Sequence, residues 1–100
     1  MHAHTVFFWL KADQSADNAA DFEAGLTALI KGAGAIAGHF GKPASSEVRE
    51  VVDDSYSYGL ILHFTDQADH DRYQASDVHL RFVDAHSHRW DGVVVYDTKC

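Results

Sequence analysis

The stretch Thr5-Val6-Phe7-Phe8-Trp9-Leu10 is apolar at every position except its threonine. A short run of β-branched and aromatic residues without polar alternation is typical of a strand that is covered on both faces. The runs Tyr56–Phe64 and Val93–Tyr96 have the same character. If helices cover one face of such a sheet, the other face needs a partner. The simplest partner is a second copy of the same sheet, so the sequence predicts a homodimer whose sheets pack face to face.

Three segments between these strands have the patterning of helices. The first carries apolar residues at i, i+4, i+7 and i+8, namely Phe22, Leu26, Leu29 and Ile30. Its N-cap is Ser15 or Asp17, and glycines at positions 32 and 34 end it. A polar helix follows over Gln67–Ala75, capped by Thr65 or Asp66, and a third begins at Val78 after Ser76-Asp77 and extends to Trp90.

With a weaker strand over Ala35–Lys42, the predicted element order is β-α-β-β-α-α-β. Four strands interleaved with helices predict an α+β, ferredoxin-like protomer with an antiparallel four-stranded sheet. A chain of 100 residues has room for one domain, spanning residues 1–100.

Composition excludes several classes of function. Eight Lys and Arg against 15 Asp and Glu give a formal net charge of −7, which disfavours binding to nucleic acid. The apolar run Val6–Leu10 is too short for a signal sequence or a membrane span, and the single Cys100 allows no internal disulfide. We therefore expect a cytoplasmic protein with no membrane partner.

Four segments resemble the stress-responsive A/B barrel (Dabb) family of dimeric α+β barrel proteins. They are His4–Lys11, Tyr56–Phe64, Tyr73–Phe82 and Val93–Asp97, and the resemblance runs nearly end to end. Its most specific element is the Tyr-x5-His-x2-Phe spacing of Tyr73, His79 and Phe82. The resemblance implies a ferredoxin-like protomer, pairing of two sheets into a barrel, and a lumen in each protomer between sheet and helices.

A plant member of this family is a polyketide cyclase that works without metal or cofactor. The resemblance implies that its active-site His, Tyr and His correspond to His4, Tyr73 and His79. Two departures count against a shared activity. Ser76-Asp77 replaces the usual His-Pro, and Leu26 stands near the position of a pocket tyrosine.

His79 is the best candidate for a general base, because a neutral imidazole can remove a proton beside a carbonyl group. Tyr73 could hydrogen-bond this base or polarise the carbonyl, with His4 as a second polar group. Each of the three could instead be structural. His86 follows His79 by two helical turns, which fits either a proton relay or a hydrogen-bonded core residue.

Apolar residues on the strands and helices could line a pocket for an aromatic or acyl ligand, or could simply form the core. The candidates for ligand contact are Val6, Phe8, Phe22, Leu26, Leu60, Leu62, His86, Trp90, Val93 and Val95. Two functions follow: a homodimer that binds a small apolar or aromatic molecule, or a cofactor-independent cyclase or lyase with a histidine base. A third and less favoured hypothesis is a purely structural dimer, in which its own side chains fill the lumen.

The chain has eight histidines, and two pairs have His-x-His spacing: His2 with His4, and His86 with His88. Zinc needs three or four converging ligands, and a His-x-His pair within a helix directs its rings to different sides. From the sequence we therefore expect neither a metal site nor a cofactor.

Overall fold

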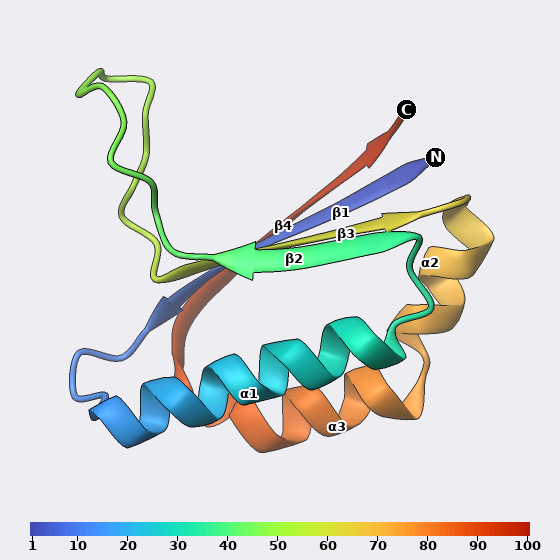
Figure 1. Cartoon of the computed structure of the whole chain (residues 1–100), viewed down its shortest axis with the longest axis horizontal. Helices are drawn as coiled ribbons and strands as arrows, with labels where there is room; N and C mark the ends of the chain where they lie inside the picture. The colour runs from blue at the N-terminus through green and yellow to red at the C-terminus, as the bar shows by residue number, and fades with distance from the viewer.

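A computed structural model describes all 100 residues, and its element order confirms the ferredoxin-like prediction (Figure 1). The elements are β1 (His2–Leu10), α1 (Ala16–Gly32), β2 (Ala37–Gly41), β3 (Tyr58–Phe64), α2 (Gln67–Gln74), α3 (Asp77–His86), the short 3-10 helix η1 (Ser87–Arg89) and β4 (Trp90–Lys99).

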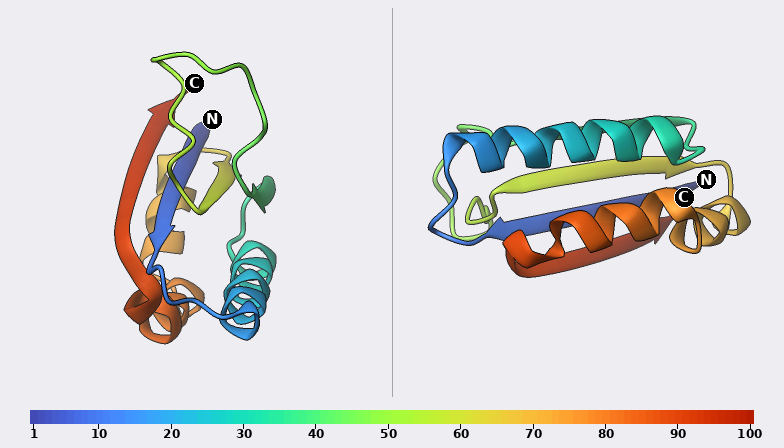
Figure 2. Two further views of the ribbon diagram at one scale, coloured as in Figure 1. Left: turned by 90° about the vertical axis from the view of Figure 1, so that its left-hand side faces the viewer. Right: turned by 90° about the horizontal axis from the view of Figure 1, so that it is seen from below.

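The four strands form one antiparallel sheet in the order β2-β3-β1-β4. β1 is central, and its residue His4 pairs with Leu62 of β3 on one side and Asp97 of β4 on the other. The helices α1 and α3 lie side by side below one face, and α2 lies at one end of the sheet (Figure 2). The long connection between β2 and β3 rises on the opposite side of the sheet.

The alternation of each strand now distinguishes the two faces, which the sequence left undecided. In β1 and β3 the even-numbered residues except Leu10 are buried and point to the helices, whereas the odd-numbered ones are partly exposed. Leu60 and Leu62 thus belong to the helix side, where they join the core with Phe22, Leu26 and Phe64. We call the other side, which carries Phe7, Ile61, Val94 and Tyr96, the open face.

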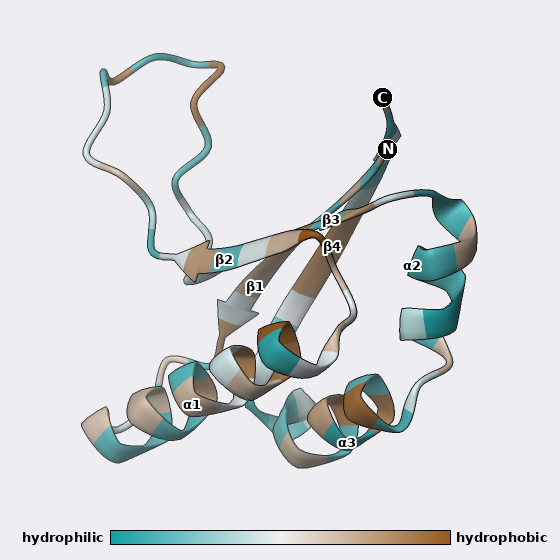
Figure 3. Cartoon of the chain, turned by 45° about the vertical axis from the view of Figure 1, so that its right-hand side comes forward, coloured by the Kyte–Doolittle hydropathy of each residue, from teal (hydrophilic) through white to brown (hydrophobic).

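Each of the three helices begins at a side-chain cap. Ser15, Asp66 and Ser76 accept hydrogen bonds from the backbone N–H groups of Asn18, Asp69 and His79. These caps satisfy N–H groups that have no partner within the helix. Polar and apolar residues alternate around α1 and α3, as expected for helices packed on one side (Figure 3). No helix is both long and apolar enough to cross a membrane.

Trp90 corrects one predicted boundary. The third helix was expected to continue to Trp90, but α3 ends at His86 and η1 follows it. Trp90 starts β4 and pairs with Leu10, and the N–H of Lys11 donates to the carbonyl of Arg89 at 2.9 Å. Pairing with β1 therefore outweighs the helical spacing of the side chains.

Candidate functional site: a cavity between the sheet and the helices

A cavity of about 130 Å³ lies between the sheet and the helices. Ten of its 13 lining residues are hydrophobic, and the other three are His4, Gln74 and His79. The sequence-predicted residues on its wall are His4, Val6, Phe8, Leu60, Tyr73, His79, Trp90, Val93 and Val95. The fold thus brings the three candidate catalytic side chains to one cavity from three different elements.

Tyr73 stands between the two histidines. Its ring is 5.8 Å from that of His4 and 5.1 Å from that of His79, measured between centroids, and meets both edge to face. His4 is contributed by β1, Tyr73 by the end of α2 and His79 by the first turn of α3. Tyr73 and His4 are each only 3% exposed and are shielded from bulk solvent, whereas His79 is partly exposed.

Ser76 fixes the link between Tyr73 and His79. Its hydroxyl donates to the carbonyl oxygen of Tyr73 at 2.6 Å and accepts from the N–H of His79 at 3.3 Å. One side chain therefore holds the last turn of α2 against the first turn of α3. The replacement of the usual His-Pro by Ser76-Asp77 keeps the helix cap and places it between the two candidate residues.

Burial sets the protonation states of the site. It lowers the pKa of His79 below the ordinary 6.5 and raises the pKa of Tyr73 above its ordinary 10.0. Burial also lowers the pKa of His4, and this effect outweighs the opposing effect of Asp97. At neutral pH the site therefore offers two neutral imidazoles and a protonated phenol.

Three residues of the cavity wall have a buried polar atom without a hydrogen-bond partner. These atoms are Oε1 of Gln74, Nδ1 of His79 and Nε1 of Trp90. Buried polar groups are usually paired, and an unpaired one costs about 1–3 kcal/mol. A small polar molecule in the cavity could pair with those of these atoms that it reaches.

Four of the predicted contact residues lie elsewhere. Phe22, Leu26 and Leu62 are completely buried in the core rather than on the cavity wall. His86 lies in a separate hollow between α1 and α3, where Nη1 of Arg89 is 2.8 Å from its Nδ1. His79 and His86 thus line different spaces, which does not support a proton relay between them.

Sequence reasoning missed four residues of the wall: Leu29, Gln74, Phe82 and Val83. Gln74 could have been found from its place beside Tyr73 at the end of a polar helix. The other three were counted as helix-face residues, and spacing alone does not distinguish a core position from a cavity wall.

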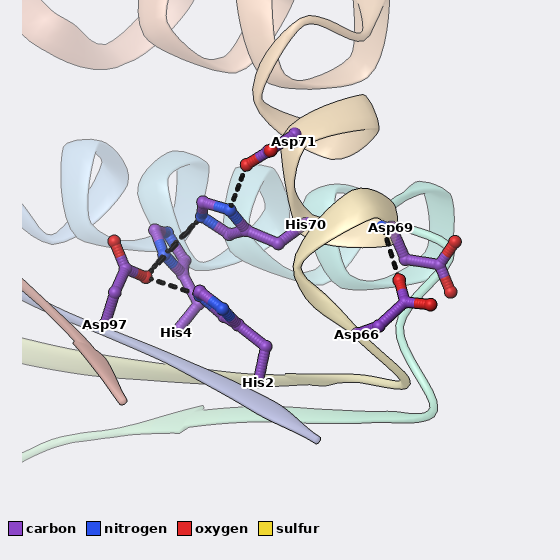
Figure 4. A network of polar contacts seen from close by, with 7 residues as sticks. All are labelled: His2, His4, Asp66, Asp69, His70, Asp71 and Asp97. Atoms are coloured by element: carbon purple, nitrogen blue, oxygen red, sulfur yellow. Dashed lines mark hydrogen bonds and ion pairs between the residues drawn. The ribbon is translucent and has the colours of Figure 1, made fainter. Parts of the chain in front are cut away.

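A polar cluster adjoins the cavity at His4. Nδ1 of His4 is 2.7 Å from Oδ1 of Asp97, and His2 and His70 contact the same carboxylate (Figure 4). Burial favours the protonated form of Asp97, but hydrogen bonds from His4 and His2 outweigh it and lower the pKa of this carboxyl. These four side chains are the ones in the chain that could hold a metal ion.

The fold and this cavity define a ferredoxin-like α+β protein with a small, largely apolar pocket beneath its sheet. The family model for the stress responsive A/B barrel domain (Dabb) matches residues 3–100. The chain therefore belongs to this family. A search of functionally curated proteins gave no match.

Three solved structures illustrate the common fold. A protein of Arabidopsis thaliana superposes with a TM-score of 0.81 at 21% identity, covering 100% of this chain and 95% of that one. A dimeric ferredoxin-like protein of unknown function from Jannaschia has a TM-score of 0.76 at 24% identity, with coverages of 99% and 98%. The hydroxynitrile lyase of Passiflora edulis has a TM-score of 0.80 at 18% identity, with coverages of 97% and 90%. At these identities the likeness extends to the fold alone.

Proposed function

We propose that this protein is a homodimer that binds a small, single-ring molecule with one polar substituent in the cavity between sheet and helices. The observation that carries the proposal is an apolar cavity whose wall holds three buried polar atoms without partners. The apolar wall would take the ring, and the unpaired atoms would take the substituent.

The size of the cavity restricts the ligand. Most ligand pockets have volumes of about 300–1,000 Å³, whereas an apolar cavity of about 150 Å³ binds benzene. A cavity of about 130 Å³ therefore suits a single six-membered ring. The volume argues against a long linear polyketide as the occupant.

The polarity of the wall favours phenol over benzene. A hydroxyl group can both donate and accept, so it could pair with Nδ1 of His79 and with Oε1 of Gln74. One such hydrogen bond contributes about 1 kcal/mol, which predicts roughly fivefold tighter binding of phenol than of benzene.

Titration of the ¹⁵N-labelled chain with phenol tests this proposal, because the two tryptophans report separately. Trp90 lines the cavity, whereas the indole of Trp9 donates to Ser55 at a distance from it. We expect a saturable shift of the Trp90 indole resonance and little change for Trp9. Non-saturable shifts of both indoles, or no shift of Trp90, would contradict the proposal.

A pair of valine substitutions supplies the matched control. Val95→Phe places a ring at the cavity wall and should abolish phenol binding. Val48→Phe makes the same change at a fully exposed position in the loop before β3 and should leave binding intact. Equal effects of the two substitutions would show that phenol binds elsewhere.

The open face supports the dimer. Along the sheet, Phe7 pairs with Val94, and Thr5 lies between Ile61 and Tyr96, so apolar side chains adjoin across three strands. Val94 and Tyr96 remain 37% and 61% exposed in the single chain. A contiguous apolar surface of this kind usually marks an interface, and the Jannaschia neighbour is described as dimeric.

A second candidate function is proton transfer without a cofactor, with His79 as the general base. It is favoured by the convergence of His4, Tyr73 and His79 on one cavity. In this reaction His79 would accept a proton from the carbon beside a carbonyl group, and the hydroxyl of Tyr73 would donate a hydrogen bond to the developing enolate oxygen. Return of the proton to carbon completes the cycle.

Deuterium exchange into cyclohexanone tests this candidate without knowledge of the natural substrate. Cyclohexanone has one six-membered ring, and its α-protons exchange with D2O whenever a base removes them. Because general-base catalysis contributes typically about 10²–10⁴-fold, His79→Gln should slow exchange by that factor. His88→Gln alters an exposed histidine and should leave the rate unchanged. An unchanged rate in His79→Gln would eliminate His79 as the base.

A further inference from the structure

Four side chains from three elements meet at the edge of the cavity where β1, β4 and α2 come together (Figure 4). His2 and His4 alternate along β1 and so point to the same side of the sheet. Asp97 is the register partner of His4 on β4, and His70 reaches the group from α2. All three histidines are buried, and 40% of the Asp97 side chain is exposed.

The distances between the donor atoms lie on either side of those in a tetrahedral coordination shell. Oδ1 of Asp97 is 2.7 Å from Nδ1 of His4, 2.9 Å from Nε2 of His2 and 3.5 Å from Nε2 of His70. All four atoms lie within 4.8 Å of one another. A tetrahedral zinc ion with ligands at about 2.0–2.1 Å holds them roughly 3.3 Å apart.

Hydrogen bonding alone leaves this group poorly satisfied. Nε2 of His70 is 3.2 Å from Nδ1 of His4, and both atoms also face the same carboxylate oxygen. At that contact one nitrogen donates and the other accepts, so the accepting nitrogen presents its lone pair to the carboxylate oxygen, which is itself an acceptor. A cation at the centre would accept a lone pair from every ring.

The surroundings of His70 fit a metal ligand. Its Nδ1 lies 3.0 Å from Oδ1 of Asp71, and donation there fixes the tautomer that leaves the lone pair on Nε2. A histidine that binds a metal usually donates its other N–H to a carboxylate or carbonyl in this way. Asp71 therefore orients the ring toward the cluster.

We propose that His2, His4, His70 and Asp97 bind a divalent transition-metal ion of the Zn²⁺ class. Three imidazoles and one carboxylate form a ligand set typical of zinc, and four protein ligands make a closed, structural site. The ion would join α2 to β1 and β4, and the exposed side of Asp97 would give it access from solvent.

Calorimetric titration of the untagged, chelator-stripped chain with Zn²⁺ measures this directly, and Co²⁺ serves as a spectroscopic probe. We expect one ion per chain, a rise in Tm with Zn²⁺, and visible Co²⁺ absorption of tetrahedral intensity. Absence of stoichiometric binding by the native chain would overturn the proposal.

Single substitutions identify the ligands. Outer-shell changes typically weaken metal binding by about 10–100-fold, so Asp71→Asn should fall in that range and His70→Gln and Asp97→Asn should lose more. Asp97 is partly exposed near the end of β4, so Asp97→Asn should fold even if His70→Gln does not. His39→Gln and Cys100→Ser alter groups outside the cluster and should bind Zn²⁺ normally. Unchanged affinity in Asp97→Asn would refute the assignment.

The metal site and the cavity share His4, but their tests are independent. Zn²⁺ titration uses no organic ligand, and phenol binding can be measured with a chelator present. Failure of the phenol experiment would leave the metal assignment standing, and failure of the Zn²⁺ experiment would leave the cavity proposal standing.

Discussion

At the scale of single residues, Ser76 shows how one hydroxyl can organise a site. By accepting from His79 and donating to Tyr73, it sets the position of two side chains that lie six residues apart. The pKa of the same imidazole is lowered because burial partly removes it from water and disfavours the imidazolium. His79 is therefore neutral where a free histidine would already be partly protonated.

This shift gives a pH prediction for cyclohexanone exchange. Only neutral His79 can accept a proton, and its pKa lies below 6.5 because burial disfavours the imidazolium. As pH falls, the rate should therefore remain high through 6.5 and decline only at lower pH. ¹H NMR of the exchange rate against pH measures the midpoint. A midpoint above 6.5, or the same profile in His79→Gln, would contradict this assignment.

At the scale of elements, the close contact of α1 with α3 depends on Gly32. A Cβ on Gly32 would lie 2.7 Å from Cγ2 and 2.9 Å from Cγ1 of Val78 at the start of α3. Val78 is β-branched and has few alternative rotamers, so α3 itself would have to move. That movement would also disturb the neighbouring Ser76 and His79.

We accordingly expect Gly32→Ala to lower the free energy of unfolding by about 1–3 kcal/mol, as overpacking does elsewhere. Gly41→Ala is the control, because a Cβ on Gly41 would meet nothing within 4 Å. Urea denaturation followed by circular dichroism measures both variants. Equal stability of Gly32→Ala and the native chain would show that α3 adjusts without cost.

At the scale of the whole molecule, the two faces of the sheet differ in what covers them. The helices cover one face and enclose the cavity, while the open face and the loop before β3 remain uncovered in the single chain (Figure 2). Val51 in that loop is exposed, like Val94 and Tyr96 on the sheet. A second copy would bury these apolar groups together.

A charge on the open face should therefore separate the dimer. Ile61→Asp introduces a carboxylate at the centre of that face, and burying it unpaired would cost several kcal/mol. Leu80→Asp places the same charge on the exposed side of α3 and should leave the dimer intact. Sedimentation velocity at micromolar concentration gives the molecular mass. A native chain that sediments as a monomer would refute the dimer.

Patterning along the chain was sufficient to predict the element order and to narrow each helix cap to two residues, of which the structure selects Ser15, Asp66 and Ser76. The apolar runs of β1 and β3, the helical spacing after Ser15 and the cap residues before α3 are local features, and each constrains only nearby backbone. The candidate trio His4, Tyr73 and His79 came from a family resemblance. The sequence analysis placed Trp90 on the third helix because its spacing is helical, and that spacing carries no information about its pairing with Leu10 in the sheet.

The sequence by itself determined the ferredoxin-like fold, because strand and helix periodicities depend on neighbouring residues. Only the tertiary structure decided which strand face meets the helices, since alternation defines two faces without naming either. It also decided that His70 and Asp97 join His2 and His4, which the His-x-His spacing alone did not suggest. These residues are separated by up to 95 positions, and pairing of β1 with β4 and packing of α2 bring them together.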